Sequence, residues 1–292
     1  IIDGTDNFNT VLWAGTGSGG TRAISGVGFS PDFVWAKNRT AAYSHVLYDS
    51  VRGVGANSEL TTDADTNPDE GGAVADTYGY LSAFDSDGFT STSGSAGDAS
   101  NLYFNQASKN YVAWNWLAGT AFSNDASATG VGSIDSAGQV NTKAGFSIVS
   151  YVGTGANATI AHGLGVKPSM VITKVRNFGS ENNWGVYHES ITADVIILLN
   201  RNTAKVDNSI YWNDTEPTTT VFSVGSANQP NANGKNIIAY CFANVEGYCK
   251  ASSYEANNNT NGPFVFTGFR PAWIMIKGAD AASAWFILDN TR

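Results

Sequence analysis

Four oxygen-bearing side chains alternate with other residues along one short acidic stretch of the sequence: Asp63, Asp65, Asn67 and Asp69. This spacing offers hard ligands in the order that a calcium-binding loop uses. Pro68, however, stands where such a loop requires its sharp-turn glycine, and Val74 stands where a bidentate glutamate would complete the site. We therefore expect a solvated acidic loop and no metal or other cofactor, with calcium binding at these four residues as the alternative.

The chain has only three histidines: His45, His162 and His188. Their spacing does not suit a metal-binding pair. A Ser-His-Asp site requires a nucleophile held beside the base, and the Gly-x-Ser-x-Gly sequence that presents such a serine does not occur. We interpret all three as turn or surface histidines without a catalytic role.

A pair of facing carboxylates would suit the hydrolysis of glycans. The candidates in predicted loops are Asp85, Asp87, Asp214 and Glu216. All of them occupy turn positions, which aspartate favours because its side chain bonds to the nearby backbone. We predict that the protein is not an enzyme and has no catalytic residues, and we keep a glycan-cleaving enzyme as the weakest of three hypotheses.

The eight tryptophans could stack on sugar rings, but five of them fall on predicted strands at positions typical of a core: Trp35, Trp114, Trp184, Trp273 and Trp285. The remaining three are less constrained by the pattern. Trp13, Trp116 and Trp212 are therefore our candidates for a surface that binds a glycan or a partner protein.

One stretch that occurs three times organises the elements that would position these residues. Its copies are 29–37, 166–174 and 269–277, with Pro31, Pro168 and Pro271 aligned. Proline fixes φ and lacks an N–H donor, so it suits the first residue of a strand. The residues after it are apolar at both alternating positions, which is typical of a strand buried on two faces. The lysine that ends each copy is expected to return the chain to water.

The sequence around these strands repeats as well, which makes an internal repeat the main organising feature. Glycine-rich hairpins precede the copies and aromatic strands follow them, while 110–116 and 236–242 match as late strands. Short strands with Gly and Asn turns predict an all-β fold of tandem β-sandwich or jelly-roll-like modules. The expected order is a first module over 1–118, a flexible linker over 119–142, a second module over 143–249, and the first part of a third over 250–292.

Composition and charge narrow the classes of function. The net charge of −9 argues against binding to nucleic acid or to an anionic membrane, because both require clustered Lys and Arg. There is no apolar run long enough for a transmembrane helix, so we expect no membrane insertion. Cys241 and Cys249 are close enough for a small loop disulfide, but Cys241 lies in an apolar strand, where a thiol serves as a small buried hydrophobe.

Several motifs in a fixed order resemble a repeated β-rich domain of virion structural proteins from marine, cyanophage-like tailed phages. They are 24–39, 49–53, 84–90, 111–116 and 161–165. The resemblance implies a non-enzymatic structural role on the virion surface, in a tail fibre or as a capsid decoration. It implies other virion proteins as partners, and we also expect a homo-oligomer. A glycan-binding module for host attachment within a tail fibre is the second hypothesis.

The third copy of the repeat presents apolar strands without the later strands of a module. Two or three strands over 250–292 cannot shield that apolar surface alone. Three arrangements would cover it: continuation of the chain past Arg292, packing onto the region of Gly247, or strands from another subunit. We expect continuation, with the segment also lying against a neighbouring subunit.

Overall fold

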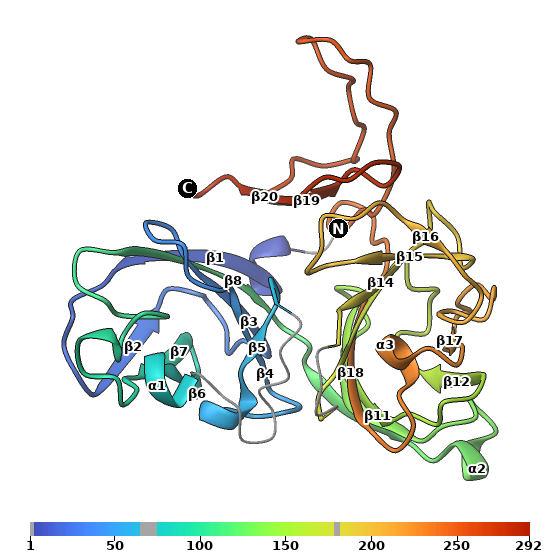
Figure 1. Ribbon diagram of the computed structural model, residues 1–292, viewed down its shortest axis with the longest axis horizontal. Coiled ribbons are helices and arrows are strands. Elements are labelled where there is room, and N and C mark those ends of the chain that lie inside the picture. The colour runs from blue at the N-terminus through green and yellow to red at the C-terminus, as the bar shows by residue number, and fades with distance from the viewer. Residues whose placement is uncertain (1–2, 65–74, 178–181) are drawn as a thin grey trace.

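The computed structural model describes residues 3–64, 75–177 and 182–292, and these form two β-sandwiches and a β-hairpin (Figure 1). The large sheet of the first sandwich has the order β1-β8-β3-β4-β5, with β1 Phe8–Ala14, β8 Asn110–Trp116, β3 Phe33–Asn38, β4 Val46–Asp49 and β5 Leu60–Thr61. Its small sheet has the order β2-β7-β6, with β2 Thr21–Ser25, β7 Gly88–Thr92 and β6 Tyr80–Asp85.

The second sandwich is built on a larger sheet. Its order is β16-β15-β14-β13-β18-β11-β10-β9, with β16 Val206–Asp207, β15 Val195–Leu198, β14 Gly185–His188, β13 Met170–Val175, β18 Asn236–Phe242, β11 Phe146–Val152, β10 Ser136–Asn141 and β9 Thr120–Asn124. The small sheet pairs β12 Ala158–Ala161 with β17 Val221–Val224. The hairpin pairs β19 Trp273–Lys277 with β20 Trp285–Asp289.

Helices are few and short in the described part of the chain. The α-helices are α1 Ala75–Tyr78, α2 Ala126–Thr129 and α3 Asn228–Asn231, and single 3-10 turns occupy Gly4–Asp6, Ala56–Ser58 and Gly97–Ala99. None of the helices found there is long and apolar enough to cross a membrane. The all-β expectation is therefore confirmed.

The two sandwiches share strand order and register. In the first, Phe33 lies opposite Trp116 and Trp35 lies opposite Trp114. In the second, the residues at the same distance from their proline, Met170 and Ile172, lie opposite Phe242 and Tyr240. The Gly-Thr-Gly turns are also held alike, because Thr16 N–H donates to Asn105 Oδ1 and Thr154 N–H donates to Asn231 Oδ1. The interpretation of the sandwiches as copies of one module remains a prediction that this correspondence supports.

The central strands of each large sheet are buried on both faces, as the apolar residues at both alternating positions of β3 and β13 predicted. One face packs on the small sheet of the same sandwich: Val34 and Tyr48 contact the cluster that contains Phe89, and Val171 and Tyr187 contact the cluster that contains Phe222. The other faces of the two large sheets pack against each other and against the hairpin. We call this third cluster the shared core.

The prediction of a flexible linker over 119–142 is wrong. Strands β9 and β10 lie within this range and extend the second large sheet, because they pair with each other and β10 pairs with β11. Small residues serve close packing here: a Cβ at Gly138 would lie 1.8 Å from the carbonyl oxygen of Ile148. Phe122 of β9 packs against the core of the second sandwich. Composition alone therefore did not distinguish a linker from closely paired edge strands.

The hairpin lies across both sandwiches, at the top of Figure 1. One of its faces joins the shared core through Trp273, Met275, Trp285 and Ile287. Residues 252–264, which precede it, are exposed and project from the molecule. The hairpin thus packs on the large sheets of both sandwiches. One of the three expected arrangements was packing onto the region of Gly247, and the observed contact is broader than that.

Candidate functional site

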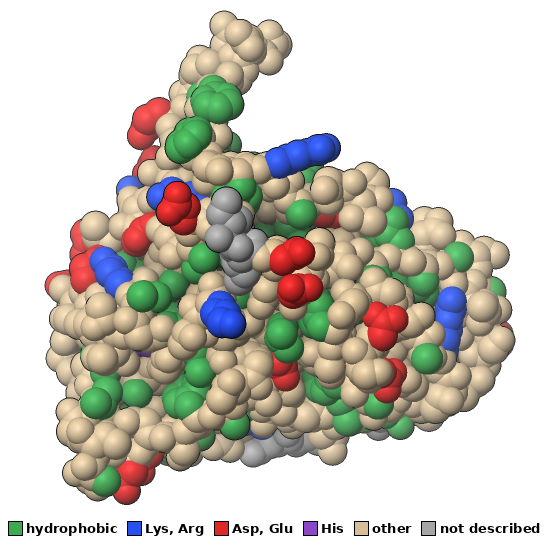
Figure 2. Space-filling view, turned by 180° about the vertical axis from the view of Figure 1, so that it is seen from behind, with side chains coloured by type: hydrophobic (Ala, Val, Ile, Leu, Met, Phe, Trp, Pro, Cys, Tyr) green, Lys and Arg blue, Asp and Glu red, His purple; other side chains and the backbone are tan. Residues whose placement is uncertain are grey.

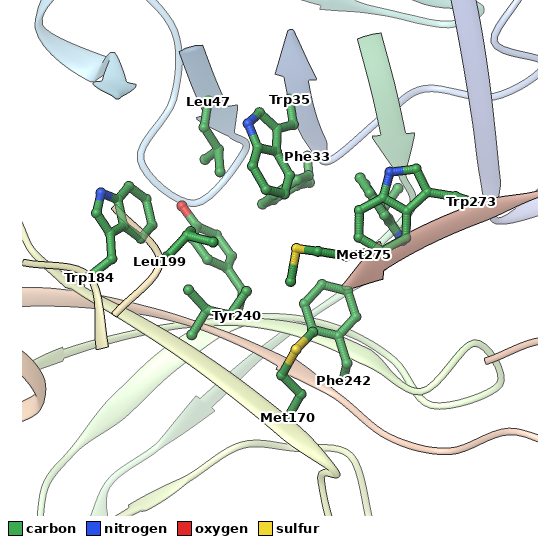
Figure 3. Close-up of a pocket in the computed structure, with 12 residues that line it drawn as sticks. Phe33, Trp35, Leu47, Met170, Trp184, Leu199, Tyr240, Phe242, Trp273 and Met275 are labelled. Atoms are coloured by element: carbon green, nitrogen blue, oxygen red, sulfur yellow. The ribbon is translucent and has the colours of Figure 1, made fainter. Parts of the chain in front are cut away.

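The shared core is the most distinctive site of the molecule, because equivalent residues of all three repeat copies meet there. The second residue after each proline contributes Phe33, Met170 and Trp273, and the fourth contributes Trp35, Ile172 and Met275. These six side chains line one small cavity together with Leu47, Trp116, Trp184, Leu199, Tyr240 and Phe242 (Figure 3). Every lining residue is apolar or aromatic, so the site holds elements together and offers no constellation for acid–base chemistry.

The lysine that ends each copy does not return the chain to water as expected. Each ammonium group donates to a backbone carbonyl that lies two or three residues before the next strand of its copy: Lys37 to Tyr43, Lys174 to Asn182 at 2.5 Å, and Lys277 to Ser283 at 2.7 Å. Lys174 is fully buried, and its ammonium also lies 5.8 Å from the Trp184 ring centroid. Burial lowers the pKa of Lys37 and of Lys277. The three lysines therefore fix the same turn in three places.

Two tryptophan indoles connect successive copies. Trp184 Nε1–H of the second sandwich donates to the carbonyl of Thr61 in the first, at 2.9 Å. Trp285 Nε1–H of the hairpin donates to the carbonyl of Leu198 in the second sandwich, at 3.0 Å. Since Thr61 and Leu198 hold equivalent places in the register, each copy contacts the preceding one in the same way.

Two aspartates complete the contacts. Asp49 accepts a hydrogen bond from Tyr240 Oη at 2.7 Å and pairs with Arg52 at 2.6 Å, and neither side chain of that ion pair is exposed. Asp289 accepts from Trp114 Nε1–H at 3.0 Å and pairs with Arg292. Burial raises the pKa of Asp289, but the hydrogen bond from Trp114 and the nearby Arg292 outweigh it and hold the pKa low.

These aspartate contacts were missed by the sequence analysis, although a signal was present. The sequence Asp-x-x-Arg occurs at 49–52 and at 289–292. Asp49 follows Pro31 at the same distance as Asp289 follows Pro271. Tyr240 and Trp114 likewise hold equivalent places in β18 and β8. The repeat shows that the two aspartates are equivalent and that Tyr240 and Trp114 are equivalent. It does not show which aspartate bonds to which ring, because each bond joins two different copies.

The tryptophans predicted to form a binding surface are not exposed. Trp116 is 7% exposed and belongs to the shared core, and Trp212 is 2% exposed in the core of the second sandwich. Trp13 is half-buried: its ring stacks on Tyr111, and its indole donates to the carbonyl of Phe104 at 2.6 Å. The prediction of a glycan or partner surface is therefore wrong for Trp116 and Trp212, which are buried, and it stays a prediction for the half-buried Trp13.

The carboxylates weighed as a hydrolytic pair serve local structure in two different sandwiches. Asp85 accepts from Thr90 Oγ1–H, and Asp87 accepts from the N–H groups of Gly26 and Gly28. Glu216 binds Lys167, Tyr187 and the N–H of Ala193. Burial raises the pKa of Glu216, but the hydrogen bonds from Lys167 and Tyr187 outweigh it and lower the pKa. Asp214 is exposed and has a positive φ of 45° in a turn, as expected.

Of the expected turn or surface positions, His162 has the turn position, but none of the three histidines lies on an open surface. His162 is fully buried in the turn after β12, where Nδ1 accepts from the N–H of Leu164 and Nε2 lies 3.3 Å from the carbonyl of Thr218. Burial lowers its pKa to about 4. Burial and the nearby Lys37 lower the pKa of His45 to about 4 as well, and burial lowers that of His188. All three therefore stay neutral at pH 7.

The weak calcium candidate can be followed at only one of its four residues. Asp63 is exposed and accepts from the N–H of His45 at 3.0 Å, while Asp65, Asn67 and Asp69 lie outside the described residues. Across the residues that the structure describes, no group of three or more His, Cys, Asp or Glu side chains is placed to hold a metal ion. Cys241 and Cys249 are both free, and burial raises the pKa of the Cys241 thiol to about 12.

Comparison with known proteins gives a family. The chain belongs to the family described as Domain of unknown function (DUF7483), whose model matches residues 3–292. The match therefore spans both sandwiches and the hairpin. Neither the curated proteins nor the solved structures gave a match.

Proposed function

We propose that this member of the DUF7483 family is a non-enzymatic structural protein of a phage virion, a tail-fibre or capsid-decoration element built from tandem β-sandwich modules. The observation that supports this proposal is the shared core, in which two sandwiches and a hairpin bury their apolar faces against one another. Contacts between domains of one chain are usually polar enough to permit relative motion, and a large hydrophobic interface restricts it. A particle component under mechanical load requires such rigidity.

The polar contacts within the shared core favour the same conclusion. The indoles of Trp184 and Trp285 and the carboxylates of Asp49 and Asp289 all bond across the boundary between copies. Each of these bonds is directional, so it fixes the angle between neighbouring copies as well as holding them together. A chain of copies joined in this way forms an extended rigid body.

The test is the location of the chain on the particle. Virions would be purified from an infected culture by density gradient, digested and examined for peptides of this chain. Antibodies raised against residues 1–292 would then be used to label intact particles for electron microscopy. We expect peptides in the particle fraction and label on the tail or capsid surface. Recovery from the soluble fraction alone, with unlabelled particles, contradicts the proposal.

A glycan array separates the proposal from host attachment through sugar binding. The tryptophans that would have stacked on sugar are packed in cores, so we expect the isolated chain to bind no glycan above background. Saturable binding to one glycan class would favour the attachment hypothesis instead. Release of reducing sugars from that glycan would favour the enzyme.

A further inference from the structure

We propose that the open edge of β19 binds an antiparallel β-strand of the same repeat pattern as 110–116 and 236–242, supplied from outside residues 1–292. The bound strand would lie on β19 as β8 lies on β3 and as β18 lies on β13. This inference concerns an interaction surface and holds whether or not the chain is a virion component.

The hairpin has the register of a complete sandwich. Trp273 lies opposite Asp289 and Met275 lies opposite Ile287. The equivalent pairs are Phe33 with Asp49 and Trp35 with Leu47 in the first sandwich, and Met170 with His188 and Ile172 with Val186 in the second. The three strand pairs therefore correspond residue for residue, and the missing neighbours of the third can be identified from the other two.

One missing neighbour is the late strand. Strands β3 and β13 each pair on both edges, with β4 and β8 in the first sandwich and with β14 and β18 in the second. Within the described residues β19 pairs with β20 alone. The N–H of Asn290 donates to the carbonyl of Ala272, so the backbone groups of the alternate residues Trp273, Met275 and Lys277 point to the other edge. An exposed row of such groups is a template for strand addition.

The outer face of the hairpin, which we define as Ile274, Ile276, Phe286 and Leu288, shows what else is missing. Ile274 is 41% exposed and Leu288 is 52% exposed. The equivalents of Ile274 are Val34 and Val171, and those of Leu288 are Tyr48 and Tyr187; all four are at most 1% exposed because a small sheet covers them. Phe264 and Phe266 are also exposed, at 89% and 77%, and Figure 2 shows hydrophobic side chains along the projection. The outer face is thus a core surface without its cover.

A second copy of this chain cannot supply the late strand without unfolding. Strand β8 is held between β1 and β3, and β18 is held between β11 and β13, so neither has a free edge. The occupant is therefore a further strand of this pattern, with large apolar side chains opposite Trp273 and Met275.

The position opposite Met275 can be specified more closely. Its equivalents, Trp114 and Tyr240, each donate to an aspartate of a neighbouring copy, Asp289 and Asp49. The second sandwich has His188 in the place of those aspartates. His188 Nδ1 accepts from the N–H of Ser190, so Nε2 carries the ring proton and requires an acceptor. A tyrosine hydroxyl can accept this bond and a tryptophan N–H cannot, so we expect tyrosine at this position of the bound strand.

The experiment uses the full chain and a fluorescein-labelled peptide of residues 234–244 with a solubilising lysine tag, which carries the β18 pattern and Tyr240. Titration followed by fluorescence anisotropy is expected to show saturable binding. A peptide with Ile238→Pro removes one backbone donor directed at β19 and should bind about tenfold more weakly, the equivalent of one lost hydrogen bond. A scrambled peptide of the same composition should not bind.

A variant and a second measurement complete the test. Met275→Pro removes a donor at the open edge of β19, and it should weaken peptide binding while circular dichroism shows the strands intact. Binding of the scrambled and proline peptides as tight as that of the unmodified peptide overturns the proposal even if that variant fails to fold, and so does an absence of binding by the unmodified peptide to the original chain. Sedimentation velocity of the chain alone detects self-association, and a dimer that the peptide does not dissociate would assign the surface to a second copy and also overturn it.

Discussion

The hairpin β19–β20 and the equivalent strands of the two sandwiches have the same register, the same lysine-to-carbonyl contact and the same place in the shared core, yet they differ in burial. Val34 and Val171 are sealed between two sheets, whereas Ile274 is open on one side. The local geometry therefore does not depend on completion of a sandwich. A β-hairpin is marginal by itself, so here the shared core must stabilise it.

The same comparison separates contacts that build a copy from contacts that join copies. The lysine-to-carbonyl bonds lie within each copy and occur in all three. The indole and aspartate bonds join one copy to another. We expect each of them to contribute more to stability where the boundary between the copies is more deeply buried. Arg52 is fully buried beside Asp49, whereas the Arg292 side chain beside Asp289 is 26% exposed. Equivalent residues are thus expected to contribute unequal free energies.

The largest expected effect tests this inequality at the aspartates. Asp49→Ala leaves the buried Arg52 charge without its carboxylate and also removes the acceptor of Tyr240, so we expect the free energy of unfolding to fall by about 3–5 kcal/mol. Asp289→Ala should cost only about 1–2 kcal/mol, because Arg292 can reach water. Urea unfolding measures both. Equal losses would mean that the boundary at the hairpin is as dry as the one between the sandwiches.

A second set of variants tests the fourth residue after each proline. Trp35 is 4% and Ile172 is 5% exposed, so replacement of either by Ala should cost about 2–5 kcal/mol by emptying a core site. Met275 is half-buried, and Met275→Ala should cost less than either. The urea concentrations at the midpoint of unfolding rank the three variants by stability, provided that the dependence of the unfolding free energy on urea is unchanged. A loss below about 1 kcal/mol at Trp35 or Ile172 would contradict the assignment of that residue to the shared core.

Much of the fold could be predicted from the sequence because the repeat is marked by strong local signals. The prolines two residues before β3 and β13, and the apolar run after each of them, identified both central strands. The turn at Asp85–Gly88 and the late strands followed from equally local patterns. Each of these signals acts within a few residues, where backbone and side-chain preferences decide the structure.

What the sequence could not show depended on contacts between distant segments. Residues 119–142 resembled a linker because nothing local reveals that β10 pairs with β11. Lys174 resembled a surface residue because its carbonyl partner at Asn182 is set by the fold. The same holds for Trp116 and Trp212, whose burial depends on sheets that the sequence places far apart.

Acidification should destabilise the protein through His162, a buried residue of the second sandwich that occupies the place of Ser25 in the first. Its pKa falls from 6.5 to about 4 on folding, so the folded state favours the neutral ring. The resulting stability is fully present above pH 6.5 and is lost as the pH falls from 6.5 to about 4, with an upper bound on the order of 3 kcal/mol.

His162→Gln is the matched variant for this prediction, since glutamine keeps a donor and an acceptor but does not titrate in that range. Unfolding free energies measured at pH 7 and pH 4.5 should differ less in the variant than in the original chain. His45, His188 and the carboxylates titrate in both proteins, so their contribution cancels in the difference. An identical acid loss in the two proteins would show that His162 already takes up a proton in the folded state.

The smallest expected effect lies on the outer face of the hairpin. Val34→Ala and Val171→Ala each remove two methyl groups from a sealed core and should cost about 1–3 kcal/mol. Ile274→Ala removes more carbon, but from a side chain that is 41% exposed, and it should cost about 0.5 kcal/mol. Chemical denaturation of the three variants gives the comparison. If a strand bound to β19 brings a cover for this face, the cost of Ile274→Ala should rise toward that of Val171→Ala, whereas a large cost in the isolated chain would mean that the outer face is already packed.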